Sequence, residues 1–186
     1  ALGVWLLSRN KRFDAPQYVL ILVFLVVTSL SVMLTGWSGG ALQQFSEFAT
    51  IVVSFFLLAN ALDSRERVVG AMAVFTVSAA VLALHGAHQA ANGVGWTGAE
   101  LVGDGRIQYV GIFSDPNDLG MLFVACMPMA AYLGSRGGLM GLRRLFWWGI
   151  CVVLLYGVYL THSRGALLSV IAMSGIWVLV RRGVFA

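Results

Sequence analysis

YVLILVFLVVTSLSVMLT, residues 18–35, is an apolar run without a single charged side chain. A helix needs about 20 predominantly apolar residues to span a bilayer, and further apolar runs follow at 48–62, 68–85, 119–132, 145–160 and 166–180. The whole chain is 59% hydrophobic and 11% charged, with a mean hydropathy of +0.86. Soluble domains carry roughly one charged residue in four. The sequence therefore predicts an all-α, polytopic transmembrane bundle of about six spanning helices.

The apolar segment ALGVWLLS, residues 1–8, is too short to span a membrane and is interpreted as the end of a preceding helix. We therefore expect residues 1–186 to form a single transmembrane domain that is a fragment of a longer polytopic protein. Cys126 and Cys151 fall inside predicted spans, where small apolar packing is the usual role. Membrane topology explains the basic pI near 9.5, so nucleic acid is not an expected partner.

The charges divide between the two sides of the predicted membrane. If the basic cluster before residue 18 is cytoplasmic, alternation of the spans places ten of the twelve basic residues on the cytoplasmic side, as the positive-inside rule requires. The exceptions are Arg106 and Arg164, which fall on the outer side. The outer side also carries most of the acidic residues, namely Glu47, Glu100, Asp104, Asp115 and Asp118. Topology alone does not explain the two outer arginines.

The polar stretch RIQYVGIFSDPNDLG, residues 106–120, contains a predicted helix start. Asp115 is suited to cap the helix, Pro116 to occupy its first position and Asp118 to take the third position of a capping box. One interpretation is that these residues, with Asn117 between them, only begin a helix. The other is that the free N–H groups of the helix start contribute to an anion site.

Arg106 and Arg164 extend the second interpretation, because a planar guanidinium matches the oxygen atoms of a phosphate. We therefore predict a phosphate site on the outer face, although Asp115 and Asp118 would repel a phosphate unless a cation or an arginine lies between. Orientation of the arginines by these carboxylates, and a role of one of them as a base, are open alternatives. For Arg164 taken alone, snorkelling to lipid headgroups is an equal alternative.

Glu47 belongs to a polar stripe with Gln43, Thr50 and Ser54, spaced so that all four share one helical face. A polar stripe of this kind is expected to face the bundle interior, because an ionisable group facing lipid is costly. Hydrogen bonding between helices and a role of Glu47 in substrate binding are both open.

His85 and His88 are three residues apart and end the third predicted span. Two histidines without a third nearby ligand indicate a zinc site only weakly, so we interpret them as polar packing at the interface. No metal and no cofactor are expected.

Two motifs carry a resemblance to a known family. GIFSDPNDLG, residues 111–120, and THSRGALLSV, residues 161–170, are separated by a span, a basic loop and another span. In this order and spacing they resemble the O-antigen ligase and O-antigen polymerase superfamily, and in particular its branch associated with protein O-glycosylation. The resemblance covers about residues 106–180; before that, only the hydropathy is compatible.

The resemblance implies a metal-independent, inverting glycosyltransferase of the bacterial inner membrane whose site faces the periplasm. Such an enzyme transfers a glycan from an undecaprenyl-pyrophosphate carrier to an acceptor, either lipid A core or a protein. Arg106 and Arg164 match the family's periplasmic arginines, which bind the donor pyrophosphate and stabilise charge as it leaves. Asn117, Asp118 and Glu47 are further candidates for substrate binding.

The chain departs from the family's pattern at one important point. The family's candidate general base is a histidine in a later periplasmic loop that this sequence does not include, and His162 is not assigned that role. We therefore expect an incomplete active site. A polymerase of the same superfamily, a transporter or flippase for an anionic lipid or solute, and a purely structural bundle remain alternatives. Surrounding membrane lipids are expected partners in every case.

Overall fold

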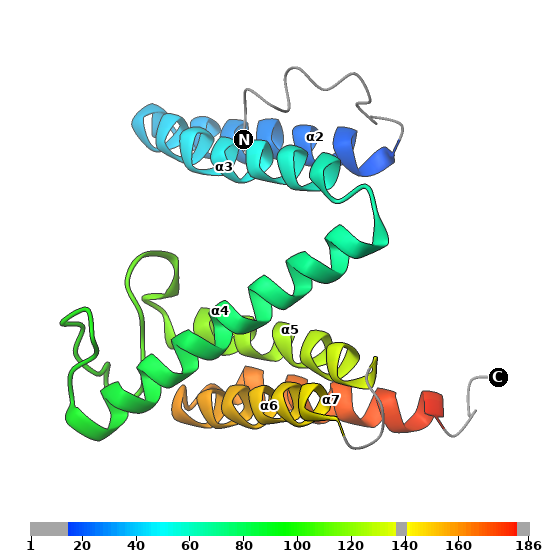
Figure 1. Cartoon of the computed structure of the whole chain (residues 1–186). Helices are drawn as coiled ribbons and strands as arrows, with labels where there is room; N and C mark the ends of the chain where they lie inside the picture. The colour runs from blue at the N-terminus through cyan, green and yellow to red at the C-terminus, as the bar shows by residue number, and fades with distance from the viewer. Residues whose placement is uncertain (1–14, 137–140, 182–186) are drawn as a thin grey trace. The chain divides into compact units, whose positions relative to one another are not determined.

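The computed structural model describes residues 15–136 and 141–181. The described chain consists of α-helices joined by turns and one longer loop, which confirms the predicted all-α class (Figure 1). Five of the helices are long and apolar enough to cross a membrane, and α7 is a shorter apolar helix. The predicted helix end at residues 1–8 lies outside the described residues. The helices are α2 (Pro16–Leu34), α3 (Ser38–Ala61), α4 (Arg65–Asn92), α5 (Pro116–Ser135), α6 (Leu142–Leu160) and α7 (Arg164–Arg181), with a 3-10 turn η1 (Gly111–Phe113) before α5.

The chain divides into two compact units, one ending at Val68 and the other beginning at Val69. The predicted single domain therefore stays a prediction. The first unit is an α2–α3 hairpin (Figure 1). Tyr18 of α2 contacts Phe55 and Phe56 of α3, with ring centroids 5.8 and 5.0 Å away. Aromatic rings at these separations attract one another beyond simple contact, so these rings hold the open end of the hairpin together.

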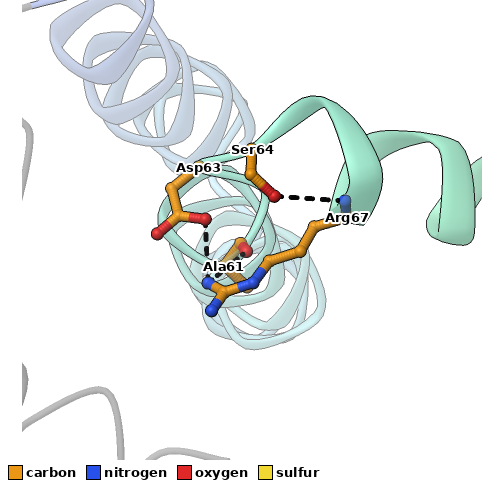
Figure 2. A network of polar contacts seen from close by, with 4 residues as sticks. All are labelled: Ala61, Asp63, Ser64 and Arg67. Carbon is orange, nitrogen blue, oxygen red and sulfur yellow. Dashed lines mark hydrogen bonds and ion pairs between the residues drawn. The ribbon is translucent and has the colours of Figure 1, made fainter.

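The turn from α3 into α4 is organised by Arg67 (Figure 2). Its Nη1 donates to the carboxylate of Asp63 at 2.8 Å and to the carbonyl of Ala61 at 3.3 Å, while its backbone N–H donates to Ser64 Oγ at 3.3 Å. The ion pair is well exposed, with 62% and 55% of the two side chains accessible. Exposed pairs of this kind contribute about 0–1 kcal/mol, so the contacts define the turn more than they stabilise it.

In the second unit α5 packs along α6 and α7, and α4 runs obliquely against α5 and α6 (Figure 1). The crossing is close because α6 presents Gly157: a Cβ there would lie 2.8 Å from the Phe123 ring and 2.9 Å from Ala83 of α4. Phe123 and Leu154 are fully buried at this point. Lipid is as apolar as these side chains, so close packing of small and large residues is what joins helices in a membrane.

Candidate functional site

A polar hollow of about 510 Å³ lies where the long loop, the start of α5 and the turn between α6 and α7 meet. Ligand sites commonly occupy about 300–1,000 Å³. The hollow is lined by Asp104, Arg106, Asn117, His162, Arg164 and Gly165. Residues that are far apart in the sequence, Arg106 and Arg164 above all, are thus brought to one place.

Arg106 is held in the hollow by both its side chain and its backbone. Its Nε donates to the carbonyl of Thr161 at 2.8 Å and its Nη2 to Asn117 Oδ1 at 2.9 Å. Its backbone N–H and C=O pair with Val102 at 3.0 Å each, across a tight turn in which Gly103 has a positive φ of 52°, a conformation that glycine adopts without penalty. Nη1 makes no hydrogen bond within the described ranges 15–136 and 141–181, so donors remain for a ligand.

The loop that carries Arg106 is fastened to α4 by the buried amide of Gln89. Gln89 Nε2 donates to the carbonyls of Ala99 and Glu100, both at 3.0 Å, and Gln89 Oε1 accepts the backbone N–H of Gln108 at 2.9 Å. Ile107, next to Arg106, is fully buried and its N–H donates to the carbonyl of Leu160 at 3.3 Å. Arg106 therefore lies on a fixed segment and not on a free loop.

The start of α5 forms as the sequence predicts. Asp115 is the N-cap and accepts the backbone N–H of Asn117 at 2.7 Å, and Pro116 is the first helical residue. Asp118 lies in the first turn, is exposed and is not among the residues lining the hollow. Its carboxylate suits the positive end of the helix. The described hydrogen bonds do not include the reciprocal bond of a capping box.

The turn between α6 and α7 supplies the opposite wall. His162 has a φ of 49°, a left-handed conformation that costs energy for a residue with a Cβ. Ser163 caps α7 by accepting the N–H of Ala166 at 3.3 Å on its hydroxyl. Gly120 of α5 allows this turn to approach, because a Cβ there would lie 2.9 Å from the Ala166 Cβ. The close approach is what brings His162 and Arg164 beside the start of α5.

Arg164 is the first residue of α7 and is exposed. In the part of the chain that the structure describes, its side chain makes no hydrogen bond or ion pair. A basic residue at the start of a helix opposes the helix dipole, so local stability does not favour an arginine here. The ionisable residues of the lining are Arg106, Arg164, Asp104 and His162. An arrangement with two guanidinium groups and one carboxylate suits an anion that has several oxygen atoms.

The other predicted site residues have different outcomes. Asn117 lines the hollow and orients Arg106. Glu47 belongs to the α2–α3 unit, where it is exposed and accepts from Gln43 Nε2 at 2.9 Å. Thr50 and Ser54 donate to carbonyls of their own helix. The stripe therefore satisfies its polar groups within α3, and a binding role for Glu47 stays a prediction.

The site residues that the sequence does not predict include Gln89, Asp104 and His162, together with Thr161 and Gly165. Asp104 was assigned to the outer side without a role, and Gln89 had the pattern of an ordinary polar residue near a helix end. The short link THSRG, residues 161–165, between two apolar runs is the available signal for His162, because a helix commonly ends with a residue in the left-handed conformation.

His85 lies beneath the long loop and is almost fully buried. Its ring contacts Trp96 and Tyr109 edge to face, with centroids 5.4 and 5.0 Å away. Neither ring nitrogen has a hydrogen-bond partner among the described residues. Those residues also contain no group of three side chains that could hold a metal ion. His85 therefore packs the loop against α4 rather than lining the hollow.

Comparison of the chain with known protein families, with curated proteins and with solved structures finds no match.

Proposed function

We propose that this chain is the membrane part of a glycan transferase of the O-antigen ligase type. It would take a glycan from an undecaprenyl-pyrophosphate carrier on the periplasmic face of the bacterial inner membrane and pass it to a glycolipid or protein acceptor. The observation that carries the proposal is the convergence of Arg106 and Arg164 on one hollow without a carboxylate paired to either among the described residues.

The division of labour between the two arginines follows from their contacts. Arg106 is oriented by Thr161 and Asn117, so it offers a preformed donor to one phosphate group. Arg164 has no such anchor and is free to adjust to a second phosphate. Pyrophosphate gains negative charge as the glycosidic bond breaks; the anchored Arg106 would stabilise that charge without reorganising, and Arg164 would add a second guanidinium once it has met the ligand. Leaving-group stabilisation of this kind requires no metal ion.

The proposal is tested by replacing Arg164 in the full-length protein and measuring glycan transfer from the lipid-linked donor. Arg164→Ala should lower the rate about 100-fold, as removal of one charge-stabilising donor does in other sites. The transfer rate of Arg164→Lys should lie between those of the wild type and Arg164→Ala, because lysine keeps the positive charge but lacks the planar guanidinium that binds two oxygens at once. Arg164 is the better target than Arg106, because truncating Arg106 also removes two bonds that hold the fold.

Arg143 provides the matched control, because it is exposed and does not line this hollow. Arg143→Ala should leave transfer unchanged. Wild-type transfer by Arg164→Ala would exclude the assigned role. Counterflow of a lipid-linked anion in proteoliposomes, without any glycan transfer, would favour a transporter instead.

A further inference from the structure

A second hollow, of about 830 Å³, lies at the other end of the α5–α6–α7 layer. It is formed by the last turns of α5, the first turns of α6 and the second half of α7. Its walls are mainly large apolar and aromatic side chains, among them Met127, Tyr132, Trp148, Met173 and Trp177. A space of this size and character suits an apolar ligand or the tail of an amphipathic one.

Arg144 is the one Lys, Arg, Asp or Glu among the residues that line this hollow. It is half-buried, and its guanidinium makes no hydrogen bond or ion pair with any residue that the structure describes. A second cation lies at the rim, because the guanidinium carbon of Arg136 is 5.8 Å from the centroid of the Tyr132 ring. No carboxylate of residues 119–186 can neutralise these two arginines, because this segment contains no Asp or Glu.

We infer that this hollow binds an anionic glycerophospholipid, with the phosphate on Arg144 and part of one acyl chain between the three helices. The hollow extends from Met127 to Ser135 along α5, which is about 12 Å at 1.5 Å per residue. Half of a bilayer's hydrocarbon core is about 15 Å thick. A lipid with its headgroup at the helix ends therefore places its chain alongside the apolar walls.

The charges select the class of headgroup. A zwitterionic lipid would bring an ammonium group close to Arg136 and Arg144, with no carboxylate from residues 119–186 to receive it. An anionic headgroup adds no such cation, and basic pockets between transmembrane helices bind lipids of this type. The walls of this hollow are mainly apolar, whereas those of the hollow with Arg106 and Arg164 are polar. The lipid-binding inference does not depend on the proposed function.

The experiment is native mass spectrometry of the detergent-solubilised full-length protein, titrated with phosphatidylglycerol or with phosphatidylcholine of the same acyl chains. The wild type should bind phosphatidylglycerol about tenfold more tightly. Arg144→Gln should weaken the binding of both lipids, because both phosphates lose a charge-assisted hydrogen bond, and it should remove most of the preference, because one of the two cations that repel the choline ammonium group is gone. Arg143 is the adjacent exposed arginine and lies outside the hollow, so it contributes only long-range attraction to an anionic lipid. Arg143→Gln should therefore weaken binding by less than about threefold.

Ser174→Trp tests the hollow independently of charge, because Ser174 lines it and a bulky side chain would fill it. This variant should lower the affinity for both lipids while keeping Arg144. Equal losses in Arg144→Gln and Arg143→Gln would overturn the inference in favour of general attraction to basic residues. Unchanged binding in Ser174→Trp, or no binding of either lipid by the wild type, would show that lipid does not occupy the hollow.

Discussion

Gln89→Ala should release the loop that carries Arg106. Three hydrogen bonds are lost, but the consequences for the partners differ. The carbonyl of Ala99 keeps the N–H of Gly95 at 2.8 Å, and the carbonyl of Glu100 keeps Gln108 Nε2 at 2.9 Å. The backbone N–H of Gln108 has Gln89 Oε1 as its partner and would be left without one.

The cost is therefore set mainly by one unsatisfied N–H group, which is worth about 1–3 kcal/mol where water is excluded. Taking roughly 2 kcal/mol, local opening of the loop becomes about 30-fold more frequent, at 1.4 kcal/mol for each factor of ten. The measurement is hydrogen–deuterium exchange of peptides within residues 99–110 in detergent or nanodiscs, since exchange reports local opening.

Two further variants separate hydrogen bonding from space filling. Gln108→Ala removes one exposed bond to the carbonyl of Glu100 and should accelerate exchange by less than about fivefold. Gln89→Glu keeps an oxygen that can accept the N–H of Gln108, but its second carboxylate oxygen would face the carbonyl oxygens of Ala99 and Glu100 and be repelled by them. Hydrogen exchange in this variant should therefore be at least as fast as in Gln89→Ala. Exchange in Gln89→Ala that is no faster than in Gln108→Ala would contradict the anchoring role of Gln89.

In each of two pairs of substitutions, the two members should change the free energy of unfolding in opposite directions, as measured by thermal unfolding. His162→Gly should stabilise by roughly 0.5–1 kcal/mol, because the φ of 49° suits glycine, whereas the same change at His88, inside α4, should cost about 1 kcal/mol. Gly120→Ala should cost about 1–3 kcal/mol by overpacking, since its Cβ would lie 2.9 Å from that of Ala166. Gly149→Ala, with open space around the new methyl group, should stabilise by up to about 1 kcal/mol; a uniform sign within either pair would contradict the packing described.

Hydropathy and capping chemistry predicted the helices because both act over a few residues. Uncharged runs marked the spans, and Asp115 with Pro116 marked the start of α5, where the structure places it. The ends were less predictable. The third apolar run at 68–85 becomes a helix from Arg65 to Asn92, about 42 Å long at 1.5 Å per residue. Helical hydrogen bonding continues beyond the apolar part, so hydropathy underestimates such a helix.

The candidate site was only partly predictable, because its geometry depends on contacts between distant residues. Counting charges on each side of the predicted membrane identified Arg106 and Arg164 without showing that they share a hollow. No local pattern distinguishes Gln89, whose buried amide selects two carbonyls and one N–H of a loop that begins after α4. The same holds for Thr161, which contributes a backbone carbonyl to Arg106, since every residue has one.

Arginine occurs at both ends of the α5–α7 layer, and the surrounding side chains determine what each can bind. Arg164 has Asp104, Asn117 and His162 around its hollow, which suit a polar anion with many oxygen atoms. Arg144 has tryptophan, tyrosine and methionine walls, which reward a ligand that brings an apolar chain with its charge. A guanidinium near the end of a spanning helix that has no protein partner is met by water, by lipid headgroups or by a ligand. Because residues 119–186 contain no Asp or Glu, neither Arg144 nor Arg164 can pair with a carboxylate of its own helix, and an anionic partner for either must come from another segment or from a ligand.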